Sequence, residues 1–258
     1  MNEAIQGLWV GEALSDMERM SLTSYLRQGH EYHLYAYNDV KNIPPGTVLK
    51  DANEILPESS IFRHEHGKHK GSVAPFADWF RYCLLWERGG WWSDTDVICL
   101  RPLHFGEPLV LASERRKFWR RQINPMLIKA PPGHPLIGEC RRRAEESDKK
   151  SLEWCAIGPE MFTEVANKRG FHGAAQPPEV FAPLDWWHAS RLVRPTQPKL
   201  PATAHTLHLW NEMWRMNGMS KTQTYPATCL YEQLKARFLT DARQPVSSPR
   251  TAARPHAA

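Results

Sequence analysis

The stretch from Ala74 to Leu100, APFADWFRYCLLWERGGWWSDTDVICL, constrains the fold of this chain more than any other. It reads as a helix, a Gly-Gly break and a strand that carries two carboxylates two residues apart. At about 100° per residue, apolar side chains cover most of the helix surface, so we expect the helix to be buried. Asp78 and Arg81 share its narrower stripe. Because a buried carboxylate and a buried guanidinium need partners, these two must pair with each other or meet a ligand.

The two carboxylates after the break, Asp94 and Asp96, are candidate metal ligands. Side chains at i and i+2 of a strand point the same way, so on a strand both can reach one divalent cation. Mg²⁺ and Mn²⁺ prefer oxygen ligands and keep positions open for phosphate oxygens. Such a metal acts as a Lewis acid on a diphosphate leaving group. A DxD motif alone is a weak signal, and its setting behind a buried helix makes it informative.

The beginning of the chain predicts a parallel strand–helix–strand unit. Residues 5–10 form an apolar run, a capping box at Ser15 starts a helix, and residues 31–37 alternate as in a strand. This order is typical of an α/β fold, in which ligands bind beyond the carboxyl ends of the strands. Trp9 lies at one such end. We expect residues 1–240 to form one domain and residues 241–258, rich in Pro, Ser, Ala and Arg, to be a disordered tail.

Composition narrows the class of protein. The 258 residues contain no apolar run long enough to span a membrane and no signal peptide. Five cysteines without a CxxC pair argue against a disulfide framework and a cysteine zinc site. The default setting is the cytoplasm, with peripheral contact at the inner face of the membrane as an alternative. A net charge of +5 fits a solvated basic surface or an anionic partner, but dispersed basic residues and the lack of a known motif argue against nucleic acid.

The histidine-rich segment 64–69 raises a second metal hypothesis. Its three histidines fit no standard zinc spacing, and the segment is polar and contains glycine. We therefore favour a mobile loop that closes over a ligand. We expect the loops around residues 63–73 and 115–121 to decide the choice of donor and acceptor.

The segment FADWFRYCLLWERGGWWSDTDVICL resembles the sugar-binding region of DXD-containing glycosyltransferases. These include initiating α-mannosyltransferases, α1,4-glycosyltransferases, bacterial capsular and lipopolysaccharide transferases, and the glucosylating domains of clostridial toxins. The family shares an Asp, an Arg three residues later, a Gly-Gly pair, and an aromatic-rich strand that ends in DxD. The matching positions here are Asp78, Arg81, Gly89, Gly90, Asp94 and Asp96.

The resemblance implies a GT-A-type fold, an α/β nucleotide-binding domain whose Rossmann-like mixed sheet is flanked by helices. It implies transfer of a sugar, with retention of the anomeric configuration, from a UDP-sugar or a GDP-sugar to a hydroxyl of a glycan or glycolipid acceptor. The implied cofactor is Mn²⁺ or Mg²⁺. The short chain resembles a small bacterial-type transferase of capsule or lipopolysaccharide biosynthesis. No general base can be named from the sequence.

The resemblance also implies roles for particular residues. Those with catalytic roles are Asp78, Arg81, Asp94 and Asp96. Trp9 stacks on the nucleotide base, and Trp92 contacts the donor together with Asp78, Arg81 and Asp94.

The metal site draws on two parts of the chain. Asp94 and Asp96 engage sugar, ribose and metal, and the segment HLWNEMW adds His208 and Asn211 as metal ligands. His205 competes with His208, because it lies three residues away.

Two other classes of function remain open. A phosphatase of the haloacid-dehalogenase type also has a DxD after a strand, with its first Asp as nucleophile. That motif lies near the N-terminus in those enzymes, and here it begins at Asp94 with no adjacent Asp-Asp or Glu-Asp pair downstream. The third class is a non-catalytic sugar-nucleotide-binding protein, which the sequence does not exclude.

Overall fold

The computed structural model describes residues 3–117 and 120–240. The predicted tail at 241–258 lies outside the described residues. The strands are β1 (Ile5–Trp9), β2 (Tyr32–Ala36), β3 (Thr47–Asp51), β4 (Gly90–Ser93), β5 (Val97–Cys99), β6 (Val110–Arg115), β7 (Arg121–Ala130) and β8 (Thr206–His208). The helices are α1 (Asp16–Arg27), α2 (Ala74–Arg88), α3 (Pro135–Glu146), α4 (Pro159–Lys168), α5 (Pro178–Phe181), α6 (Asn211–Met216) and α7 (Leu230–Phe238).

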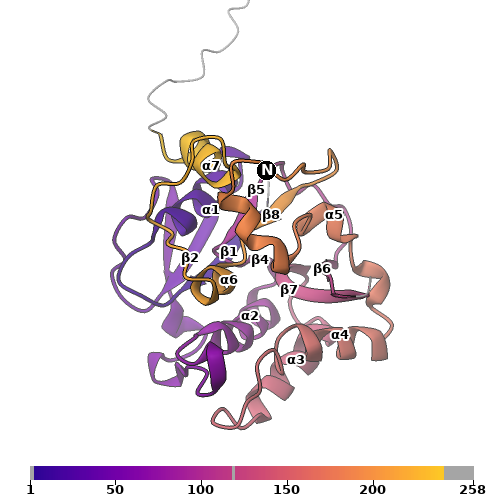
Figure 1. Ribbon diagram of the computed structural model, residues 1–258. Coiled ribbons are helices and arrows are strands. Elements are labelled where there is room, and N and C mark those ends of the chain that lie inside the picture. Colours follow the sequence, from indigo (N-terminus) through magenta and orange to yellow (C-terminus); the bar gives the residue numbers. More distant parts are fainter. Residues whose placement is uncertain (1–2, 118–119, 241–258) are drawn as a thin grey trace, which may run out of the picture.

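A six-stranded mixed sheet forms the centre of the fold, in the order β3-β2-β1-β4-β7-β6. The pairs β1–β2, β2–β3 and β1–β4 are parallel, whereas β4–β7 and β6–β7 are antiparallel. A second, two-stranded sheet pairs β5 with β8. In Figure 1, α2, α3 and α4 lie on one side of the large sheet, and α1 and α7 lie on the other. The expected α/β fold with a mixed sheet flanked by helices is confirmed.

The start of the chain folds as its sequence predicts. The Ser15 backbone N–H donates to Glu18 Oε2 at 2.8 Å, which completes the capping box of α1. Helix α1 then connects β1 to its parallel neighbour β2. The predicted Gly-Gly break after the buried helix is also present, because Gly89 ends α2 with a φ of 64°, and a Cβ there would lie 2.5 Å from Pro132 Cδ. This position therefore requires glycine.

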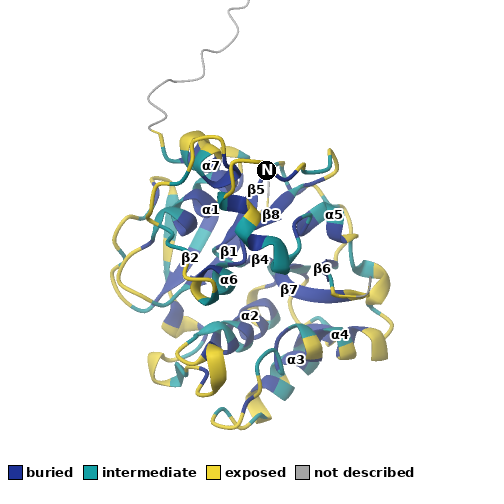
Figure 2. Cartoon of the chain, in the orientation of Figure 1, coloured by how far each residue is buried: buried dark blue, intermediate teal, exposed yellow. Residues whose placement is uncertain are grey.

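Strand β4 connects the two halves of the core. Trp91 and Trp92 are consecutive and both buried, and successive side chains of a strand face opposite sides of the sheet. Trp92 packs in the hydrophobic cluster that includes Phe80 of α2, and Trp91 packs in the cluster that includes Tyr25 of α1. Figure 2 shows the buried residues concentrated along these central strands.

The DxD motif does not lie on a strand, which corrects the sequence-based expectation. Strand β4 ends at Ser93 and β5 begins at Val97, so Asp94 and Asp96 belong to the turn between them. The Val97 N–H donates to the Asp94 carbonyl at 3.2 Å. Because β4 and β5 join different sheets, the chain must change direction here, and that turn brings the two carboxylates together.

An irregularity in β7 lies beside this turn. The register of β6 and β7 shifts between Leu111, which faces Ile128, and Ala112, which faces Asn124. Pro125 and Met126 of β7 lie between Asn124 and Ile128, and their backbone carbonyls contact residues of the candidate site. The Pro125 carbonyl accepts from Arg81 Nη1 at 2.6 Å, and the Met126 carbonyl accepts from the Asp94 N–H at 2.8 Å. Such bulges commonly adjust the direction of the backbone near binding sites.

Two expectations from composition are met within the described residues. All five cysteines are free in the structure, as expected. In the part of the chain that the structure describes, no helix is both long and apolar enough to cross a bilayer.

Candidate active site

One cavity of about 740 Å³ gathers residues from distant parts of the chain. It is lined by the end of β1, the start of α2, the β4–β5 turn, parts of β6 and β7, residues 152–160 and residues 208–216. Every residue that the sequence predicts for the site lines this cavity: Trp9, Asp78, Arg81, Trp92, Asp94, Asp96, His208 and Asn211. The structure thus brings the whole predicted set to one place.

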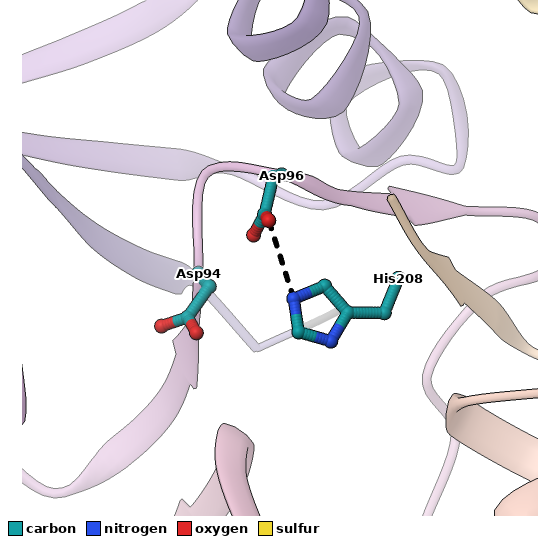
Figure 3. Close-up of side chains that lie close together, drawn as sticks. All are labelled: Asp94, Asp96 and His208. Atoms are coloured by element: carbon teal, nitrogen blue, oxygen red, sulfur yellow. Dashed lines mark ion pairs between the residues drawn. The ribbon is translucent and has the colours of Figure 1, made fainter. Parts of the chain in front are cut away.

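Three of these residues form a cluster that can hold a metal ion. Asp94, Asp96 and His208 each offer a ligand atom, and these atoms lie within 4.8 Å of one another. Figure 3 shows the chain turning between the two aspartates and His208 arriving from β8 to meet them, with Nε2 3.2 Å from Asp96 Oδ2. Two carboxylates and one imidazole suit Mn²⁺ or Mg²⁺ and leave positions open for phosphate oxygens. The residues present therefore fit a divalent cation.

The choice between the two histidines is decided by strand position. His208 lies in β8 opposite Val97, next to Asp96, whereas His205 is bound to the Pro102 carbonyl at 3.1 Å and does not line the cavity. Asn211 acts through its backbone here, because its N–H donates to Asp96 Oδ2 at 2.7 Å.

The pKa values of the three clustered residues are shifted in different directions. Burial acts to lower the pKa of His208, but the carboxylate of Asp96 outweighs it and raises that pKa above its usual value. Burial acts to raise the pKa of Asp96, but His208 and the hydrogen bonds that Asp96 accepts bring it below the usual value. The pKa of Asp94 is raised, because its burial outweighs the opposing effect of Arg81. The metal-free pair of His208 and Asp96 therefore favours the ion-paired form.

Arg81 joins the helix to the DxD turn. Its Nη2 lies 3.1 Å from Asp78 Oδ1, and its Nη1 lies 3.1 Å from Asp94 Oδ1. The guanidinium carbon also lies 5.0 Å from the centre of the Trp92 ring, and the Trp92 Nε1–H donates to Asp94 Oδ1 at 2.8 Å. The predicted pair on α2 is thus present, and Asp94 is a second carboxylate partner of the same arginine.

Asp78 lies against the residues that precede α4. Burial raises its pKa to about 7, with Asp94 adding to the shift and Arg81 opposing it. A Cβ on Gly158 would lie 2.6 Å from Asp78 Oδ2, so the backbone approaches the carboxylate closely. The nearby Tyr82 hydroxyl donates to the Ile157 carbonyl at 3.1 Å, which ties this segment to α2.

Trp9 lies at the carboxyl end of β1, as the βαβ interpretation expects. The ammonium nitrogen of Lys221 lies 5.8 Å from its ring centre. Its indole Nε1 is buried and has no hydrogen-bond partner within the described residues. A polar atom in this state is satisfied when a ligand or water supplies an acceptor.

The histidine-rich segment belongs to the rim of the cavity. His69 Nδ1 lies 2.7 Å from Glu212 Oε1, and the His69 ring stacks on Trp154 with centroids 3.9 Å apart. Arg215 donates to the Lys68 carbonyl at 2.9 Å. Within the described residues, these histidines form no cluster that could hold a metal. The segment is instead joined to α6 and to residues 150–154.

Sequence reasoning missed Glu114 and Asn124, which also line the cavity. Asn124 Nδ2 donates to Glu114 Oε2 at 2.7 Å, and both residues are buried. Burial raises the pKa of Glu114, and the hydrogen bond from Asn124 opposes the shift. The available signal was a single acidic residue between an apolar strand and a basic run at 115–121.

Comparison with known proteins agrees with this geometry. Residues 15–117 match the family described as "Glycosyltransferase sugar-binding region containing DXD motif". The resemblance to DXD-containing glycosyltransferases seen in the sequence is thus confirmed over this segment.

The curated relatives are named glycosyltransferases. The human alpha-1,4-N-acetylglucosaminyltransferase is 29% identical over 152 residues, covering 53% of this chain and 42% of the relative. The lactosylceramide 4-alpha-galactosyltransferase of Pan troglodytes is 26% identical over 206 residues, covering 74% of this chain and 56% of the relative. The chain thus spans about half the length of the curated relatives it matches.

Among solved structures, the PaToxG glycosyltransferase matches with a TM-score of 0.47 and 12% identity, covering 92% of this chain and 87% of that chain. The catalytic domain of alpha-toxin from Clostridium novyi matches with a TM-score of 0.37 and 6% identity, covering 92% and 76%. The similarity to glycosyltransferases therefore rests on the sequence matches.

Proposed function

We propose that this chain is a metal-dependent glycosyltransferase. It transfers a sugar from a nucleoside-diphosphate sugar, a UDP-sugar ahead of a GDP-sugar, to a hydroxyl of a glycan or glycolipid acceptor with retention. The observation that carries this proposal is the convergence of Asp94, Asp96 and His208 beside the Asp78–Arg81 pair in one cavity. A divalent cation, Mn²⁺ ahead of Mg²⁺, would supply Lewis-acid stabilisation of the diphosphate leaving group there.

The chain's own residues would then bind and orient the donor. Trp9 offers its ring to the nucleotide base and its unpartnered Nε1–H to an acceptor atom. Asp78 accepts hydrogen bonds from sugar hydroxyls, and Trp92 supports the donor from β4. Arg81, fixed in place by its carboxylate partners, is a preorganised positive charge near the departing diphosphate.

The names of the relatives support the acceptor and the linkage. One relative is named for α-1,4 transfer of N-acetylglucosamine, and another is named for α-transfer of galactose to lactosylceramide, a glycolipid. An α-linked product is what retention yields from an α-linked donor.

Thermal stability tests donor and metal binding together. A UDP- or GDP-sugar with Mn²⁺ should raise the melting temperature, since ligand at about 100 times its Kd stabilises by about 2.7 kcal/mol. Asp96→Asn keeps the acceptor oxygen for the Asn211 N–H and removes the charge, so the shift should disappear. Asp39→Asn, an exposed carboxylate outside the cavity, is the matched control and should keep it.

Turnover separates the three classes of function. Mn²⁺-dependent slow hydrolysis of one sugar nucleotide is expected from a transferase without acceptor. Release of phosphate from generic phosphoesters, without sugar-nucleotide turnover, would support the phosphatase instead. Tight Mn²⁺-dependent binding with neither hydrolysis nor transfer would support a non-catalytic binding protein.

A further inference from the structure

Glu114 is a buried carboxylate in the cavity to which the proposed donor chemistry gives no role. Its residue is 7% exposed, and its Oε2 accepts a hydrogen bond from Asn124 Nδ2 at 2.7 Å. Within 3–117 and 120–240, no lysine, arginine or histidine forms an ion pair with it. A carboxylate offers about four acceptor sites, and burying one without donors is costly. Glu114 therefore has unused acceptor capacity at a cavity wall.

The strand register explains how Glu114 is aimed. Glu114 on β6 faces Gln122 on β7, and Ala112 faces Asn124, so Asn124 is the diagonal neighbour of Glu114 on the same face. Asn124 immediately precedes Pro125, whose carbonyl binds Arg81. The Glu114–Asn124 pair is thus built into the same distorted part of β7 that positions the arginine.

The chemistry of the carboxylate selects its ligand. A carboxylate repels a diphosphate unless a cation lies between them, and Glu114 is not part of the cluster that can hold a cation. It does accept hydrogen bonds from hydroxyl groups, and bonds to an ionised acceptor are stronger than neutral ones. The part of a glycosyl-transfer reaction that must present a hydroxyl is the acceptor.

A second hollow indicates the direction from which the acceptor arrives. It has a volume of about 590 Å³, and Arg116 and Trp186 line both it and the main cavity. Glu114 lies near the end of β6, two residues before Arg116, which follows that strand. A saccharide that enters between Arg116 and Trp186 meets an aromatic ring and then the carboxylate. The indole ring of a tryptophan such as Trp186 is a flat apolar surface with a polar N–H at its edge, which suits the face of a sugar ring.

We propose that Glu114, held by Asn124, binds a hydroxyl of a saccharide acceptor and orients that acceptor for transfer. This assignment rests on the proposed glycosyltransferase function, and it adds a residue that discriminates between acceptors.

The test compares Glu114→Gln and Glu114→Ala with the wild type. The assays use the UDP- or GDP-sugar that the wild type hydrolyses, Mn²⁺, and a panel of galactose, N-acetylglucosamine and lactose as acceptors. Both variants should keep the Mn²⁺-nucleotide thermal shift and should hydrolyse the donor to water within about twofold of the wild type. The KM for the acceptor should rise about tenfold or more, because a buried hydroxyl contact is lost.

Glu107→Gln is the matched control, since Glu107 is an exposed carboxylate outside the cavity and should leave the acceptor KM unchanged. Loss of the thermal shift or of donor hydrolysis in Glu114→Gln would assign Glu114 to the donor side and overturn the inference. So would unchanged acceptor kinetics in both variants, or a wild type that hydrolyses donor but glycosylates no saccharide of the panel. A wild type with neither thermal shift nor hydrolysis would instead reject the proposed function itself.

Discussion

Arg81 makes polar contacts with Asp78, with Asp94 and with the carbonyls of Ala77 and Pro125. Its side chain is 5% exposed. We expect Arg81→Ala to lower the free energy of unfolding by about 3–5 kcal/mol, because it leaves the buried carboxylate of Asp78 and the partly buried carboxylate of Asp94 without their cation. Urea unfolding measures this change.

The control for this substitution lies on the same helix. Arg88 forms a half-exposed pair with Glu54, so Arg88→Ala should cost about 1 kcal/mol or less. Equal losses in the two variants would contradict a special role for Arg81.

Protonation of His208 should affect two properties in opposite directions: the stability of the metal-free protein and the affinity of the site for Mn²⁺. In metal-free protein its raised pKa means that its pairing with Asp96 stabilises the fold fully below about pH 6.5. That contribution is lost as the pH rises through the folded-state pKa. Metal binding needs the neutral imidazole, so Mn²⁺ affinity should fall as the pH falls through the same pKa.

Melting temperatures in EDTA and in Mn²⁺ across this pH range check both trends. His208→Gln should flatten them, and His33→Gln, which removes a surface pairing with Glu31, should not. A stabilisation by Mn²⁺ that is independent of pH would argue against His208 as a ligand.

At the scale of elements, the segment before α4 fits closely against α2. Gly158→Ala would place a Cβ 2.6 Å from Asp78 Oδ2, so the carboxylate must shift. We expect a loss of about 1–3 kcal/mol in stability and weaker binding of the donor sugar relative to the free nucleotide. Calorimetric titration with both ligands measures the difference. At Gly173 a Cβ meets nothing within 4 Å, so Gly173→Ala should change neither property.

The elements also show where sequence patterns were sufficient. The capping box at Ser15, the glycine that ends α2 and the extended segments at β1 and β2 are local features, and the structure has them. The DxD motif was expected on one strand, and it lies in the turn between β4 and β5. Periodicity identifies extended segments, but it contains no information about which sheet each segment joins, and that decides where the chain must turn.

At the scale of the whole molecule, the cavity closes through contacts between segments far apart in the chain. His69 and Glu212 are one such pair, and Arg215 adds a bond to the Lys68 carbonyl. Glu212→Ala should loosen the loop at 64–72, because His69 and Arg215 both lose their shared carboxylate. Amide hydrogen exchange should become faster in that loop and stay unchanged in the centre of α2.

Glu146→Ala, which removes a surface pair on α3, is the control for this prediction and should leave the loop unchanged. Unaltered exchange at 64–72 in Glu212→Ala would show that the stacking of His69 on Trp154 is sufficient to hold the loop.

The sequence by itself determined the α/β class, the buried helix with its Asp78–Arg81 pair, and the resemblance of the DXD segment to a known family. These depend on periodicity, caps and motif spacing within about 25 residues, which are properties of the local chain. Only the tertiary structure decided that Asp94 is a second partner of Arg81, that His208 rather than His205 joins the aspartates, and that Glu114 lines the cavity. Each of these depends on strand order and register, which follow from the packing of the whole chain and are not encoded in any one segment.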